Sequence, residues 1–217
     1  MRRQEGNEQK ETSMEHPYEE HLWKDYPRIL GMDEAGRGPI CGPLVVAGVI
    51  FEAGYQNERI NDSKKLSEKK REALFETIQQ DALAYWILFV DEETIDAQNI
   101  YRATQNAMLK IAGLANADYI LSDAMPLPRC ENSEALVKGD SKSLAIAAAS
   151  ILAKVSRDHY MFALDEAYPQ YGLKSHKGYP TKKHLQAIEE YGIQSFYRRS
   201  YGPVAKILER EDRLTLF

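Results

Sequence analysis

Short apolar runs of strand length alternate along this chain with longer stretches in which apolar residues recur at helical spacing. The apolar runs cover residues 29–32, 44–51, 84–90, 119–121 and 135–137. The segment AGRGPICGP, rich in glycine and proline, separates the first two runs and predicts a strand, a turn and a second strand. Strands that alternate with helical patterns predict an α/β fold.

Three main helices are predicted between and after these strands. Ser67 is placed to cap a helix over residues 67–80, and residues 95–114 repeat apolar side chains at helical spacing. Residues 143–164 predict a long helix whose first half, AIAAAS, is small enough to pack closely against a sheet. The first 26 residues are polar and Glu-rich, which predicts a loose tail with a short helix over residues 16–23.

Three of the apolar runs end at carboxylates. Asp33 and Glu34 follow the first run, Asp123 follows the fourth and Asp140 follows the fifth. Open α/β sheets bind ligands at the carboxyl ends of their strands, so neighbouring strands would bring these four side chains together. A single aspartate at a strand end is more often a turn or cap residue, and it is the recurrence that favours a shared site.

Four carboxylates without a nearby Cys or His suit Mg²⁺ or Mn²⁺ better than zinc. Two such ions support hydrolysis at phosphorus, and no Ser–His pair of suitable spacing points to a protein nucleophile instead.

The glycine-rich turn, residues 35–43, can be interpreted as a phosphate-binding loop. It lacks the GK[ST] ending of a P-loop, however, and Pro39 removes a donor where a phosphate-binding helix would begin.

Length and composition fit one domain of ordinary size, since 43% of the 217 residues are hydrophobic. The two cysteines give neither a disulfide framework nor zinc spacing, and no apolar run is long enough to cross a bilayer, so we expect a cytoplasmic protein. The net charge of −5 is unevenly placed, with eleven Lys or Arg against six Asp or Glu between residues 138 and 206. This basic third suits a polyanion, and an ordinary solvated surface explains it equally well.

The segment GMDEAGRGPICGPLVVAGVIF resembles the signature of the type-two ribonucleases H, the ribonuclease HII family. Further motifs follow in the family's order over about residues 28–203: NDSKKLS at 61–67, NIYRATQNAM at 99–108, LSDAMPL at 121–127, KGDSKSLAIAAASILAKVSRD at 138–158 and HKGYPTKKH at 176–184. The resemblance implies a ribonuclease H-like fold, with a mixed central sheet flanked by helices and a helical C-terminal part. It also implies a metal-dependent endonuclease that cuts the RNA strand of RNA–DNA hybrids. The same resemblance implies cleavage 5′ to ribonucleotides embedded in duplex DNA, leaving 3′-hydroxyl and 5′-phosphate ends.

Carried over to this chain, the family's catalytic and metal-binding carboxylates are Asp33, Glu34, Asp123 and Asp140. The Gly36-Arg37-Gly38 segment matches the loop that reads the ribose 2′-hydroxyl, and only glycines let a backbone approach a sugar so closely. Tyr179 matches the tyrosine that packs on the deoxyribose 3′ to the ribonucleotide. Candidate phosphate contacts, each as readily a solvated surface residue, are Lys64, Lys154, Arg157, Lys177, Lys182 and Lys183.

The chain departs from the shared motifs at its ends and at one internal position. We expect a polar N-terminal extension over residues 1–27, a catalytic domain over residues 28–206 and a C-terminal tail over residues 207–217. Tyr197 stands where many relatives have histidine. His176 and His184 could lie near the metal, but we interpret them as surface or phosphate-facing residues. The last residues resemble the peptide by which bacterial proteins dock on the DNA sliding clamp, or else they cover the protein's own core: Arg213, Leu214, Leu216 and Phe217.

Two other functions stay open alongside this one. A nuclease of the same fold that acts on DNA branches or single strands would cut all-DNA substrates. A binding protein that recognises hybrids without cutting would lack one of the carboxylates, and all four are present. We expect the protein to act as a monomer.

Overall fold

A five-stranded sheet with the order β3-β2-β1-β4-β5 forms the centre of the computed structural model, which describes residues 17–61 and 66–215. The strands are β1 (Ile29–Ala35), β2 (Leu44–Ile50), β3 (Ala84–Val90), β4 (Tyr119–Asp123) and β5 (Ser133–Leu136). β2 pairs antiparallel with β1 and β3, while β4 pairs parallel with β1 and β5. The mixed sheet that the resemblance implies is therefore confirmed.

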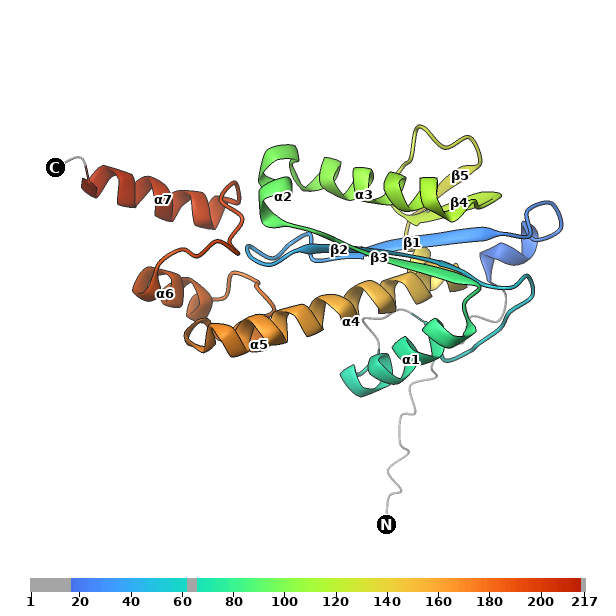
Figure 1. The fold of residues 1–217 in the computed structure, drawn as a ribbon, viewed down its shortest axis with the longest axis horizontal. Coiled ribbons are helices and arrows are strands. Elements are labelled where there is room, and N and C mark those ends of the chain that lie inside the picture. The colour runs from blue at the N-terminus through green and yellow to red at the C-terminus, as the bar shows by residue number, and fades with distance from the viewer. Residues whose placement is uncertain (1–16, 62–65, 216–217) are drawn as a thin grey trace, which may run out of the picture.

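Helices cover both faces of this sheet (Figure 1). On one face lie α1 (Glu68–Asp81) and the long α4 (Leu144–Ala167), and on the other lie α2 (Glu92–Gln98) and α3 (Ile100–Ala115). α4 approaches β1 so closely that a Cβ on Gly31 would lie 2.3 Å from the carbonyl carbon of Ala145. The small residues at the start of α4 thus do pack tightly on the sheet, as the sequence predicts.

The C-terminal helices gather at one end of the sheet, at the left of Figure 1. They are α5 (Leu173–His176), α6 (Lys182–Tyr191) and α7 (Gly202–Thr215). Their apolar side chains form a cluster of their own, which also takes in Ile40 and Cys41 from the turn after β1. α7 continues to Thr215, and its Ile207 and Leu208 pack in this cluster, so the segment predicted as a C-terminal tail begins as the second half of a helix.

Two further segments differ from the sequence prediction. The helix expected over residues 95–114 is broken at Asn99, whose φ is 64° and whose side chain caps α3 by accepting a hydrogen bond from the Arg102 amide. The short helix expected over residues 16–23 is present as the 3₁₀ helix η1 (Tyr18–His21), but its surroundings are not loose, because Tyr18, Leu22, Trp23 and Tyr26 pack against the sheet. Ser67, in contrast, caps α1 as predicted, accepting from the Lys70 amide at 3.3 Å.

Candidate active site

Asp33, Asp123 and Asp140 lie together at or just beyond the carboxyl ends of three neighbouring strands. β1 and β4 run parallel with Met32 opposite Ser122, so Asp33 and Asp123 follow side by side. β5 lies beyond β4, and the chain turns after it into the 3₁₀ helix η3 (Gly139–Ser141), which carries Asp140. One carboxylate oxygen of each residue lies within 4.8 Å of the other two. The structure thus brings three of the four predicted carboxylates into one cluster.

Burial and the negative charges of its neighbours make Asp33 costly to ionise. Asp33 and Asp140 are buried, and Asp123 is half-buried. Burial, together with the negative charges of Glu34 and Asp123, raises the pKa of Asp33 well above its usual range. Hydrogen bonds from Ser150 and from the Glu34 amide oppose that rise without cancelling it. A cation bound among the three carboxylates would relieve the repulsion.

Glu34, the fourth predicted carboxylate, lies beside the cluster. Among the described residues, the group whose oxygens meet within 4.8 Å contains Asp33, Asp123 and Asp140 and does not include Glu34. Glu34 Oε1 instead accepts a hydrogen bond from Arg37 Nη1 at 3.2 Å. The negative charge of Glu34 nevertheless contributes to the raised pKa of Asp33.

The donor set of the cluster fits a hard divalent cation. Three carboxylate oxygens from three separate backbone elements converge, and the group contains neither Cys nor His. Oxygen ligands of this kind are preferred by Mg²⁺ and Mn²⁺, whereas zinc and copper sites favour nitrogen and sulfur. The Gly139 amide holds Asp123 in place by donating to its Oδ1 at 2.7 Å.

The glycine loop after β1 meets Tyr179 directly. A Cβ on Gly38 would lie 3.1 Å from Cε1 of Tyr179, a residue that is 52% exposed. Gly36 has a φ of +99°, and a Cβ there would lie 2.2 Å from Nε of Arg157. Gly36 is therefore required by its backbone conformation and by close approach, while a side chain at Gly38 would press on Tyr179. The loop and the tyrosine, far apart in sequence, lie against each other after the strand that carries Asp33 and Glu34.

Arg198 holds this loop in place by hydrogen bonds to its backbone, a role that no sequence pattern suggests. Its side chain is fully buried, and Nε and Nη2 donate to the Gly42 carbonyl at 3.0 and 2.7 Å. Nη1 donates to the carbonyls of Pro39 and Arg37, at 2.9 and 3.3 Å. A buried arginine is rare unless its donors are satisfied, and here loop carbonyls satisfy them.

Arg157, predicted as a phosphate contact, is buried and has a different role. Its guanidinium donates to the carbonyls of Pro43, Lys177 and Cys41 at 3.0, 3.0 and 3.1 Å. Burial and the neighbouring charge of Arg198 lower its pKa to about 10. The prediction that Arg157 contacts phosphate is therefore wrong. Its guanidinium lies inside the protein, where its hydrogen bonds join the glycine loop to the segment before Tyr179.

Two histidines support the segment that carries Tyr179. His184 is fully buried, with Nδ1 2.8 Å from the Tyr179 carbonyl and Nε2 2.9 Å from the Tyr197 hydroxyl, and burial lowers its pKa to about 4. His176 stacks on it at 4.0 Å between ring centroids and accepts from the Gly178 amide. The interpretation of His184 as a surface or phosphate-facing residue is wrong, and Tyr197 is its partner.

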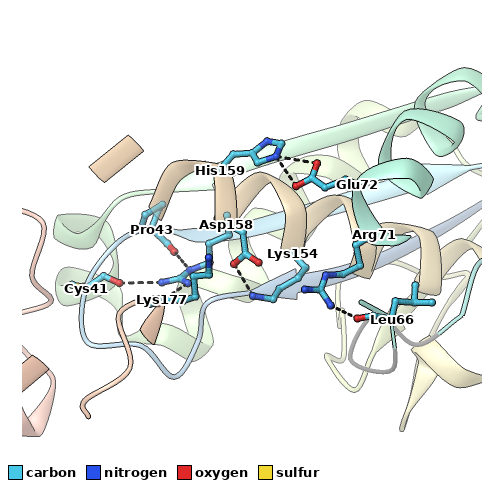
Figure 2. A network of polar contacts seen from close by, with 10 residues as sticks. Cys41, Pro43, Leu66, Arg71, Glu72, Lys154, Asp158, His159 and Lys177 are labelled. Carbon is cyan, nitrogen blue, oxygen red and sulfur yellow. Dashed lines mark hydrogen bonds and ion pairs between the residues drawn. The ribbon is translucent and has the colours of Figure 1, made fainter. Parts of the chain in front are cut away.

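The predicted lysines differ in their surroundings. Lys154 is partly exposed and pairs with the buried Asp158 at 2.6 Å, as Figure 2 shows. Lys177 Nζ lies 3.3 Å from the centroid of the Phe162 ring. Lys182 and Lys183 are exposed in the first turn of α6. Lys64 lies outside the described residues.

The predicted docking peptide is only partly described. Arg213 is exposed in the last turn of α7, while the side chain of Leu214 and all of Leu216 and Phe217 lie outside what the structure describes. Across residues 17–61 and 66–215, none of the helices is both long and apolar enough to cross a membrane.

Comparison with known proteins gives consistent matches. Residues 30–204 match the family model of Ribonuclease HII. The chain is 54% identical over 181 residues to the Ribonuclease HII of Clostridioides difficile, covering 82% of this chain and 71% of that protein. The structure resembles ribonuclease H2 from Pyrococcus horikoshii, with a TM-score of 0.73, 27% identity and coverage of 86% and 99% of the two chains. It also resembles the RNase HII of Archaeoglobus fulgidus in its complex with PCNA, with a TM-score of 0.69, 29% identity and coverage of 80% and 95%.

Proposed function

The chain belongs to the ribonuclease HII family, and from this membership we propose which of its residues carry the reaction and how they read the substrate. The protein is an endoribonuclease that acts on RNA–DNA hybrids and depends on a divalent metal ion, as its family does. In our proposal Asp33, Asp123 and Asp140 hold the metal, and Glu34 adds its charge beside them.

The observation that carries this proposal is the meeting of three carboxylates from β1, β4 and η3 within 4.8 Å. Bound divalent ions would supply activation of the attacking water and stabilisation of the leaving oxygen. The raised pKa of Asp33 supports the same view, because a buried carboxyl surrounded by like charges is ready to accept a cation. Ser150 and the Glu34 amide orient Asp33, and the Gly139 amide orients Asp123.

Substrate reading is assigned to the glycine loop and Tyr179. Backbone groups of Gly36, Arg37 and Gly38 approach the ribose and recognise its 2′-hydroxyl, which is the group that distinguishes RNA from DNA. The exposed Tyr179 ring lies next to Gly38 and packs on the following deoxyribose. This pairing favours a junction between a ribonucleotide and DNA, with cleavage on the 5′ side of the ribonucleotide and 3′-hydroxyl and 5′-phosphate ends.

Phosphate contacts of the duplex are assigned to the lysines around this surface. Lys182 and Lys183 are exposed on α6, close in sequence to Tyr179. Lys154 and Lys177 are partly exposed on the side of α4 that Figure 2 shows. Such contacts position a duplex without reading its sequence. Lys64 is the remaining lysine that we propose as a phosphate contact.

We also propose that the C-terminal peptide docks on the DNA sliding clamp. The related A. fulgidus enzyme has been seen in complex with PCNA, and here Arg213, Leu214, Leu216 and Phe217 would enter the hydrophobic groove of a clamp. Arg213, whose side chain the structure describes, is exposed in the last turn of α7.

The proposed reading of the substrate is tested with three end-labelled duplexes: all DNA, DNA with one ribonucleotide, and a long RNA–DNA hybrid. Each is incubated with Mg²⁺ or with EDTA. We expect one metal-dependent cut, 5′ to the single ribonucleotide, and no cut in the all-DNA duplex. Cleavage of the long hybrid alone would remove the junction role of Tyr179 and of the glycine loop. Cleavage of the all-DNA duplex would favour a DNA-directed nuclease of the same fold.

A further inference from the structure

The buried carboxylate of Glu19 caps the start of α4 from a segment that the sequence predicts to be loose. Glu19 is 2% exposed, and its oxygens accept hydrogen bonds from Ser143 Oγ at 2.6 Å, the Ala145 amide at 2.8 Å and the Leu144 amide at 3.3 Å. Ser143 Oγ in turn accepts from the Ile146 amide. The amides that a helix leaves without partners at its N-terminus are therefore shared between Ser143 and a residue more than a hundred positions away.

Tyr18 adds one contact on each side of η3. Its amide donates to the Lys142 carbonyl at 2.8 Å, and its hydroxyl donates to Glu134 Oε2 of β5 at 2.7 Å. Leu22 and Trp23 pack on the cluster that contains Leu121 of β4 and Leu136 of β5. Figure 1 shows the first described residues, in blue, beside the sheet where α4 begins.

The contacts of Tyr18 and Glu19 lie on both sides of the short backbone segment that carries Asp140. η3 is only three residues long, and it follows Lys138, whose φ of 56° is unusual for a residue with a side chain. Beyond Asp140 the chain reaches Lys142 and Ser143, the two residues that Tyr18 and Glu19 bind. The position of Asp140 relative to Asp33 and Asp123 thus depends on a short turn with one end fixed by the N-terminal segment.

We propose that Glu19 is a positioning residue for the metal site: by fixing Ser143 and the first turn of α4, it sets the place of Asp140 in the carboxylate cluster. This inference rests on the proposed metal site and goes beyond it, because the hydrogen bonds of the Glu19 carboxylate go to Ser143, Leu144 and Ala145 at the start of α4. The segment 17–26 is accordingly part of the active-site scaffold, and not an extension of the catalytic domain.

The test is Mn²⁺ binding to the full-length protein without substrate, followed by the electron paramagnetic resonance signal of free Mn²⁺. Glu19→Gln has nearly the same size, but it loses the charge and turns an amide donor toward backbone amides. We expect its Mn²⁺ affinity to fall by about tenfold, as happens when groups that orient metal ligands are changed. Affinity for a hybrid in EDTA should stay at the wild-type value, whereas kcat should fall.

Leu74→Ala is the matched control, because it destabilises the core between α1 and α4 away from the carboxylates. It should lower the melting temperature while leaving Mn²⁺ affinity unchanged. Wild-type Mn²⁺ affinity in Glu19→Gln would overturn the inference. Should Glu19→Gln fail to fold, Glu19→Asp replaces it, since the shorter side chain keeps the charge but cannot span to all three donors; unchanged affinity there would overturn the inference equally. Asp140→Asn separates the two hypotheses, because wild-type Mn²⁺ affinity in that variant would remove the proposed metal site itself.

Discussion

Gly38 and Tyr179 are in contact distance across 141 positions of sequence: a Cβ on Gly38 would lie 3.1 Å from Cε1 of the tyrosine ring. In our proposal the loop recognises the ribose and the ring packs on the next sugar, so this contact would let each of the two set the position of the other. If the proposal holds, specificity for a ribonucleotide–DNA junction depends on the absence of a side chain at position 38.

Gly38→Ala tests this relationship. The added methyl group pushes the Tyr179 ring outward by a few tenths of an ångström, so we expect kcat/KM on a single-ribonucleotide duplex to fall roughly tenfold to a hundredfold. Gly113→Ala is the control, because Gly113 lies exposed in α3 with nothing within 4 Å of a Cβ. That change should leave cleavage unchanged and stabilise the protein by about 1 kcal/mol. Wild-type cleavage by Gly38→Ala would contradict the shared positioning.

Arg198→Ala should destabilise the whole C-terminal end of the sheet. The substitution leaves the buried carbonyls of Pro39 and Gly42 without their donor, which costs about 3 kcal/mol or more in the free energy of unfolding. Urea denaturation measures the loss. Arg199→Ala is the matched neighbour, and because that side chain is exposed its effect should stay within about 0.5 kcal/mol. Equal stabilities of the two variants would refute the anchoring role of Arg198.

His184 should make the protein less stable in acid. Its pKa is lowered from 6.5 to about 4 in the folded protein, so between these values the unfolded chain binds a proton that the folded chain does not. The free energy of unfolding therefore falls as the pH drops from 6.5 toward 4, by about 2 kcal/mol between pH 7.5 and pH 5.

The raised pKa of Asp33 acts in the opposite direction, so the contribution of His184 is read from the difference between wild type and His184→Asn. The variant should be less stable at pH 7.5 but should lose less stability on acidification. An identical pH dependence of the two proteins would show that His184 does not titrate as we expect.

Deletion of Arg213 to Phe217 should abolish retention on an immobilised sliding clamp while hydrolysis of a hybrid continues at the wild-type rate. The control is Glu209→Ala, an exposed change on the same helix that leaves the peptide intact. Unchanged clamp retention together with a lower melting temperature would show that these residues cover the protein's own core instead.

The parts of the fold that could be predicted are those determined by residues close together in the sequence. Ser67 caps α1, the apolar runs become strands, and the small residues of α4 mark the helix that lies closest to β1. The break at Asn99 was missed because the apolar spacing continues through it, and only the left-handed backbone there separates α2 from α3.

The part of the candidate site that could be predicted from the sequence is the set of aspartates at the ends of strands. Asp33 and Asp123 lie where parallel strands must bring them, and Asp140 follows the next strand. Arg198, His184 and Glu19 could not be found in this way, because a buried charge or imidazole has partners distant in sequence and carries no periodic signal. Arg157 was misassigned for the same reason, since exposure cannot be read from residue type.

The central claim is that the three clustered aspartates carry metal-dependent cleavage at a ribonucleotide. It is tested most directly by the rate at which wild type and Asp123→Asn cut a labelled DNA duplex with one ribonucleotide in Mg²⁺. Removing one anionic ligand should remove several kcal/mol of stabilisation of the transition state, so we predict one cut 5′ to the ribonucleotide for wild type and a rate at least about a hundredfold lower for the variant. Cleavage by Asp123→Asn at the wild-type rate would contradict the account.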